Sequence, residues 1–131
     1  MRRFLQVFCA VFSGLLLALA IPNELYKLGS PLIGLFSLAP LYLAVVRSKS
    51  YNEAFFVCAL QALACHLASS FWLAFFHGYA LFTLGASALG TAGYHGLFGW
   101  LYLQGHRERI NTLFCAMMKD REDMGNFTEE A

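Results

Sequence analysis

Two histidines, His66 and His95, lie in a long apolar stretch of this sequence, where an ionisable side chain is unusual. An imidazole there can relay protons, or it can stay neutral and form a hydrogen bond with a carbonyl or hydroxyl group. The interval 54–106 contains no Asp or Glu that could complete a proton relay. We therefore favour structural hydrogen bonding, with a serine such as Ser69 or Ser70 as the partner.

The four cysteines do not form a recognisable metal site or nucleophile. Cys58 and Cys65 would share one face of a helix, but a single neighbouring histidine does not complete a zinc ligand set. Small apolar packing explains both thiols better. The sequence also contains no serine-hydrolase, metalloprotease or phosphate-loop motif. We therefore predict no catalytic residue, no metal site and no cofactor within this sequence.

Aromatic residues gather around His77, and they include Trp72 and Phe76. Such a cluster is typical of the aromatic belt at the headgroup level of a membrane. Two interpretations stay open: the cluster anchors the chain, or it lines a mouth through which lipid chains or headgroups enter. We take Trp72, Phe76 and His77 as candidate residues of a lipid-facing mouth.

The composition indicates that the surface of this protein faces the lipids of a membrane. The 131 residues are 59% hydrophobic and 13% charged, with a mean hydropathy of +0.57. A soluble domain carries about a quarter charged residues. The net charge of +1 also leaves no basic surface for nucleic acid. These values favour an integral membrane protein and exclude a nucleic-acid-binding domain.

Uncharged intervals set the limits of the expected membrane spans. About 20 helical residues cross a bilayer, so the intervals 4–23 and 28–46 fit one span each, and 54–106 fits two. We predict an all-α integral membrane protein with about four transmembrane helices, at about 4–20, 32–46, 54–76 and 82–103.

The positive charges predict the orientation. With the N-terminus in the cytoplasm, every Lys and Arg except Lys27 falls on the cytoplasmic side. Both termini should then be cytoplasmic, and the loops 21–31 and 77–81 external. Arg2 and Arg3, with the apolar stretch and small residues that follow, also fit a cleaved secretory signal, which would leave three spans.

Small residues form one face of the fourth predicted span: Ala88, Ala92, Gly96 and Gly99. Such a face lets another helix approach closely. We favour packing within the chain over formation of a homodimer.

Beyond residue 104 the pattern changes. Apolar residues recur with helical spacing between basic residues: Ile110, Leu113, Phe114, Met117 and Met118. This pattern predicts a C-terminal amphipathic helix on the cytoplasmic leaflet, followed by an acidic tail. The expected organisation is a transmembrane domain over 1–104 and a cytoplasmic segment over 105–131.

Three passages resemble the N-terminal membrane part of bacterial apolipoprotein N-acyltransferases, and the likeness covers about residues 10–109. They are SGLLLALAIP at 13–22 with its short loop into LAPL at 38–41, SFWL at 70–73, and YHGLFGW at 94–100. The loop lengths and the position of Trp72 agree as well.

The resemblance implies an eight-helix enzyme of the bacterial inner membrane with an external nitrilase-like domain. A Glu-Lys-Cys triad there moves an acyl chain from a phospholipid to the N-terminal cysteine of a lipoprotein, through a thioester. Lipid would enter near Trp72, Phe76 and His77. None of the four cysteines stands in a catalytic motif, so no triad residue is carried over.

We therefore expect a membrane portion that is inactive alone. It is either a fragment or a half-protein that works with membrane phospholipid and a separately encoded remainder of the enzyme. Two alternatives remain: a small four-helix transporter, in which His66 or His95 replaces the missing acidic residue, and a non-catalytic membrane scaffold that uses the small-residue face.

Overall fold

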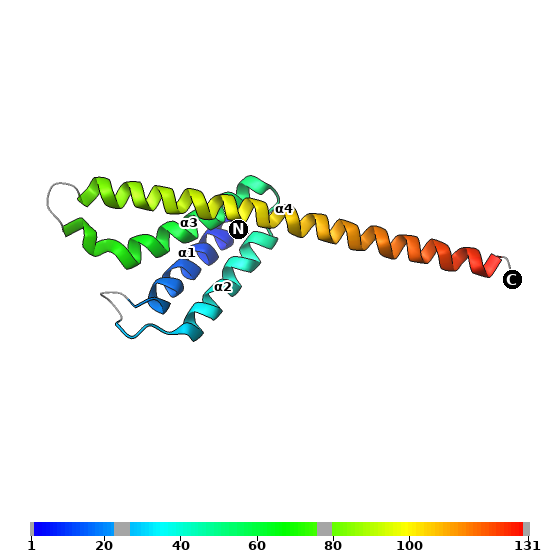
Figure 1. The fold of residues 1–131 in the computed structure, drawn as a ribbon, viewed down its shortest axis with the longest axis horizontal. Coiled ribbons are helices and arrows are strands. Elements are labelled where there is room, and N and C mark those ends of the chain that lie inside the picture. The colour runs from blue at the N-terminus through cyan, green and yellow to red at the C-terminus, as the bar shows by residue number, and fades with distance from the viewer. Residues whose placement is uncertain (1, 23–26, 76–79, 130–131) are drawn as a thin grey trace.

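The computed structural model describes residues 2–22, 27–75 and 80–129, and the regular structure in these ranges is all helical (Figure 1). The elements are four α-helices and a short 3-10 helix: α1 (Arg2–Ala20), α2 (Pro31–Val46), α3 (Tyr51–Ser70), η1 (Phe71–Phe75) and α4 (Ala80–Glu129). The all-α prediction is confirmed. Two helices have the length and hydropathy of a membrane span, over Arg3–Ala20 and Tyr51–Ser70, and α2 is apolar but shorter.

Local sequence signals explain where α2 and α3 begin. Pro31 occupies the first turn of α2, where the missing backbone N–H costs no hydrogen bond. The hydroxyl of Ser50 caps α3 by accepting the backbone N–H of Glu53 at 3.2 Å. The Glu53 carboxylate in turn accepts the backbone N–H of Lys49 at 2.7 Å, which fixes the chain as it enters the helix.

Just before α2, one glycine adopts a left-handed conformation. Gly29 has a φ of 58°, which residues with a side chain rarely adopt. Ser30 then donates its backbone N–H to the carbonyl of Ala20 at 2.9 Å. This bond ties the start of α2 to the end of α1.

Helix α3 is the central element of the bundle, since it packs against both α1 and α4 (Figure 1). Helix α2 packs mainly on α1 and makes few contacts with α4. The beginnings of α1 and α3, the end of α2 and the middle of α4 come together at one end of the bundle, which we call the convergent end. The end of α1, the beginning of α2 and η1 lie away from it (Figure 1).

Glycines allow the backbones to approach α3 on two sides. A Cβ at Gly14 of α1 would overlap the carbonyl oxygen of Gln61 and lie 2.9 Å from the Ala64 side chain. On the opposite helix, a Cβ at Gly99 would lie 2.8 Å from the carbonyl oxygen of Ala54. Close approach of this kind drives helix association where lipid removes the hydrophobic incentive.

Buried hydrogen bonds join α1 to α2. The Ser13 hydroxyl is fully buried and donates to the Ser37 carbonyl at 2.6 Å. The Gln6 amide donates to the carbonyl of Ala44 at 3.3 Å and contacts the Ser48 hydroxyl at 3.4 Å. Each bond satisfies a polar group that would be costly to leave unpaired in an apolar surrounding.

Arg107 attaches α4 to the turn between α2 and α3. Its guanidinium donates to the carbonyls of Ser48 at 3.0 Å and Lys49 at 2.7 Å. The same group lies 5.0 Å from the centre of the Tyr51 ring, within the range of a cation–π contact. Ser48 and Lys49 follow the end of α2, so their carbonyls lie outside the helical hydrogen bonds, and Arg107 supplies their partner.

The fourth predicted span and the predicted C-terminal amphipathic helix belong to one element, since α4 continues without interruption from Ala80 to Glu129. The stretch contains no proline, and Gly105 is the only glycine between Gly99 and Gly125. The side chain of Gln104 also donates to Glu108 at 3.2 Å across the predicted junction. A change of surface pattern therefore does not end the helix, because the residues on both sides favour helix.

The α1–α3 contact predicts a position-specific effect of one methyl group. Gly14→Ala should lower the free energy of unfolding by about 1–3 kcal/mol, because the new Cβ would overlap α3. Thermal unfolding in detergent measures the change. Gly93→Ala is the matched control, since a Cβ at that position would have no other atom within 4 Å, and it should be neutral or stabilising. Equal destabilisation by both substitutions would contradict the close approach.

Candidate functional site

Trp72 is the one residue of the predicted mouth that the structure places. It lies in η1, at the end of the bundle away from the convergent end, and its side chain is 40% exposed. Phe76 and His77 lie outside the described residues. The structure therefore gives the position of Trp72, and the mouth remains a prediction.

His66 forms a hydrogen bond, but with a different serine from the two that the sequence suggested. Its Nε2 lies 2.9 Å from the Ser87 hydroxyl, so the bond links α3 to α4. The Ser69 hydroxyl instead donates to the carbonyl of Cys65 at 2.8 Å. Ser87 likewise donates to a carbonyl of its own helix, that of Leu84 at 3.1 Å, and its oxygen still faces the His66 ring, so the packing of α4 on α3 decides the partner.

His95 has a local role in the structure. Its Nδ1 lies 2.9 Å from the Thr91 carbonyl of the same helix, and the side chain is exposed. Within the described residues, no three His, Cys, Asp or Glu side chains come together as a metal site. The two histidines lie on separate hydrogen bonds and do not form a joint relay among the described groups.

The small-residue face of α4 is in contact with α3. Ala88, Gly96 and Gly99 are buried, and Ala92 is half-buried. A Cβ at Gly96 would lie 2.8 Å from the Phe55 ring. This face is therefore covered within the chain along much of its length, which leaves little of it for a second molecule.

The cysteines differ in exposure. Cys58 is buried against Gly99, and Cys9 and Cys65 are half-buried. Cys115 is exposed on the second half of α4. All four are free thiols, and Cys115 is the one that a reagent in water would reach most easily.

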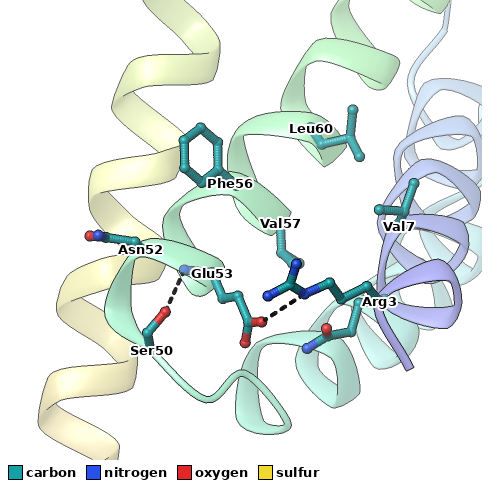
Figure 2. Close-up of a pocket in the computed structure, with 9 residues that line it drawn as sticks. Arg3, Val7, Ser50, Asn52, Glu53, Phe56, Val57 and Leu60 are labelled. Carbon is teal, nitrogen blue, oxygen red and sulfur yellow. Dashed lines mark hydrogen bonds and ion pairs between the residues drawn. The ribbon is translucent and has the colours of Figure 1, made fainter. Parts of the chain in front are cut away.

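A pocket between α1 and α3 was missed by the sequence reasoning (Figure 2). We call it the α1–α3 pocket; its cavity volume is about 410 Å³. It is lined by Arg3, Gln6, Val7, Ser50, Asn52, Glu53, Phe56, Val57 and Leu60. In Figure 2, Arg3 and Val7 of α1 face Glu53 and Val57 of α3, while Asn52 and Phe56 form the side away from α1.

The α1–α3 pocket contains an ion pair at its rim. The Arg3 Nε and a Glu53 carboxylate oxygen are 3.8 Å apart, and the two side chains are 92% and 27% exposed. An exposed pair of this kind contributes about 0–1 kcal/mol to stability. The distance between the Arg3 Nε and the Glu53 oxygen is too long for a hydrogen bond, so the guanidinium can bind another acceptor.

A second depression lies among α2, α3 and α4 and has a volume of about 290 Å³. Its lining is almost entirely apolar apart from two tyrosines, Tyr42 and Tyr102, whose rings meet edge to face at 6.4 Å. It exists because α2 makes few contacts with α4. The sequence could not reveal either pocket, since both depend on which helices pair.

Comparison with known families gives a match over most of the chain. Residues 13–118 match the family described as the apolipoprotein N-acyltransferase N-terminal domain. No solved structure gives a significant match.

Three curated relatives are similar to this chain. It is 39% identical over 111 residues to apolipoprotein N-acyltransferase 2 of Treponema denticola, which is 85% of this chain and 21% of the relative. The corresponding protein of Treponema pallidum is 40% identical over 104 residues, or 79% and 19% of the two chains. The apolipoprotein N-acyltransferase of Borreliella burgdorferi is 30% identical over 96 residues, or 72% and 18%. The chain thus spans about a fifth of the length of these relatives.

The His66–Ser87 bond predicts an energetic coupling between α3 and α4. A double-mutant cycle with His66→Ala and Ser87→Ala, measured by thermal unfolding in detergent, should give a coupling energy of about 0.6 kcal/mol. The control cycle pairs His95→Ala with Ser87→Ala and should give additive effects, because His95 bonds within its own helix at Thr91. Additive effects in both cycles would contradict the interhelical bond.

Proposed function

Because this chain belongs to the apolipoprotein N-acyltransferase family through its N-terminal domain, we propose that it is the membrane-embedded N-terminal portion of such a protein. The match over residues 13–118 carries the proposal. The reaction it serves is transfer of an acyl chain from a phospholipid to the N-terminal cysteine of a lipoprotein. The chain's own contribution is structural: it holds helices that shape a membrane site.

The surface of the bundle supports membrane insertion. Large apolar side chains are exposed on every α-helix, for example Phe4 at 76%, Phe36 at 70%, Phe56 at 70% and Leu89 at 72%. Contiguous apolar surface of this extent is unfavourable in water. We propose four spans in the bacterial inner membrane, made by α1, α2, α3 and the first half of α4, with the shorter α2 packed against α1.

The charges support one orientation. Arg3, Arg47, Lys49 and Arg107 belong to the convergent end, whereas Lys27 lies in the connection at the other end. By the positive-inside rule, the convergent end is cytoplasmic. Both termini are then cytoplasmic, and Trp72 lies at the external face, where the proposed lipid entrance is located.

The chemistry of acyl transfer requires residues beyond those described. Among the described residues no three His, Cys, Asp or Glu side chains come together as a metal site, the four cysteines are free thiols, and the chain spans about a fifth of the length of its relatives. We propose that a separate or continuing segment supplies the triad, and that residues 1–131 alone do not transfer acyl groups. Trp72, Phe76 and His77 would line the route by which phospholipid reaches that segment.

A chimera tests the family role. Residues 13–118 replace the corresponding segment of the Treponema denticola relative in a bacterium depleted of its own apolipoprotein N-acyltransferase. Mass spectrometry of a lipoprotein N-terminus should show an acylated amine with the chimera. The truncated relative and residues 1–131 alone, each as a control, should leave the amine free. Acylation by residues 1–131 alone, or an inactive chimera that inserts normally, would contradict the proposal.

The orientation predicts where Cys115 is accessible. A membrane-impermeant maleimide should label Cys115 in inverted vesicles and leave it unlabelled in intact spheroplasts, because the second half of α4 lies in the cytoplasm. Cys115→Ser should abolish the labelling, since the other thiols are half-buried or buried. Lys27→Cys in that background should reverse the pattern. Labelling of Cys115 from outside would refute the orientation.

A further inference from the structure

We propose that the α1–α3 pocket binds a phospholipid of the cytoplasmic leaflet whose headgroup carries a phosphate and a primary ammonium group. This proposal rests on the orientation given above and concerns a different place from the lipid entrance near Trp72. The headgroup meets Arg3 and Glu53, and the upper part of one acyl chain lies along the apolar part of the pocket. Phosphatidylethanolamine has this chemistry.

The pocket changes from polar to apolar along the helix axes. On α1, Arg3 is followed one turn later by Val7, and on α3, Glu53 is followed by Val57 and then Leu60. Residues four apart lie above one another on the same face of a helix. The charged groups therefore lie at one end of the pocket and the aliphatic groups at the other, which is the polarity of a phospholipid.

The apolar end is accessible to an acyl chain. Val7 is 48% exposed, and Phe56 is 70% exposed at the side of the pocket away from α1. These side chains face the surrounding solvent, which is hydrocarbon in the proposed membrane orientation. A chain of methylene groups would fill the cavity of about 410 Å³ without displacing a protein segment among the described residues.

The charges select the headgroup. The Arg3 guanidinium is suited to a phosphate, because its planar donors match phosphate oxygens. The Glu53 carboxylate, 3.8 Å from Arg3, is suited to an ammonium that can donate hydrogen bonds. A purely anionic headgroup would place negative charge beside Glu53, and a quaternary ammonium has no N–H to donate. The Arg3–Glu53 pair therefore favours a headgroup with a primary ammonium over an anionic headgroup and over one with a quaternary ammonium.

The pocket also lies at the correct depth. Its charged end is formed by the first turns of α1 and α3, at the same end of the bundle as Arg107 and the carboxyl end of α2. In the proposed orientation this is the level of the cytoplasmic headgroups. The headgroup thus contacts the charged end of the pocket while the acyl chain contacts its apolar end.

Native mass spectrometry tests the proposal. The purified full chain is delipidated in detergent and mixed with equal amounts of phosphatidylethanolamine, phosphatidylcholine and phosphatidylglycerol that carry identical acyl chains. We expect at least fivefold preferential retention of phosphatidylethanolamine. Glu53→Gln should remove the preference over phosphatidylglycerol, and Arg3→Gln should reduce retention of all three lipids. Glu108→Gln and Lys119→Gln, which change exposed charges on α4, should change nothing.

A pocket-filling variant provides an independent check. Leu60→Trp should reduce phosphatidylethanolamine retention at least fivefold while leaving helicity, measured by circular dichroism, unchanged. Equal retention of the three lipids by the natural chain would overturn the proposal, and so would unchanged retention in both charge variants. Such a failure differs from failure of the family role, because the Cys115 labelling pattern and acylation by the chimera do not depend on this pocket.

Discussion

The close contact of α3 with a glycine on either side is the constraint on which the rest of the bundle depends. Gly14 brings α1 against the Gln61 carbonyl, and Gly99 brings α4 against Ala54. Helices surrounded by lipid gain little from burying apolar surface, so close packing and interhelical hydrogen bonds must hold them together. The His66–Ser87 bond joins the same pair of helices as the Gly99 approach, and the α1–α3 pocket lies between the pair that Gly14 brings together.

The convergent end adds a second kind of restraint, which is polar. Gln6 links α1 to the end of α2, and Arg107 links α4 to the turn before α3. These bonds join segments that are 38 and 59 residues apart in sequence, so they fix the bundle rather than any single helix. The same concentration of charge marks the expected cytoplasmic side. Arg107, for example, both holds α4 to the turn before α3 and contributes to the charge on which the proposed orientation depends.

Much of the fold could be predicted from local sequence, whereas the partner of His66 and the α1–α3 pocket could not. The uncharged intervals predicted helices at 4–20 and 32–46, close to α1 and α2, whereas the third predicted span, 54–76, differs from α3, which begins at Tyr51 and ends at Ser70. The fourth predicted span and the predicted amphipathic segment form one helix, α4, since a change from apolar to amphipathic pattern alters the surroundings of a helix without ending it. The partner of His66 and the α1–α3 pocket depend on helix pairing, which no local pattern specifies.

The buried side chains of the bundle have their hydrogen-bond partners within the described part of the chain. The Ser13 bond to Ser37 and the Arg107 bonds are all made within residues 2–107. Such internal pairing spares these buried groups the cost of an unmade hydrogen bond in an apolar surrounding. What the bundle leaves open is apolar surface, which either lipid or the remaining helices of a longer relative can cover.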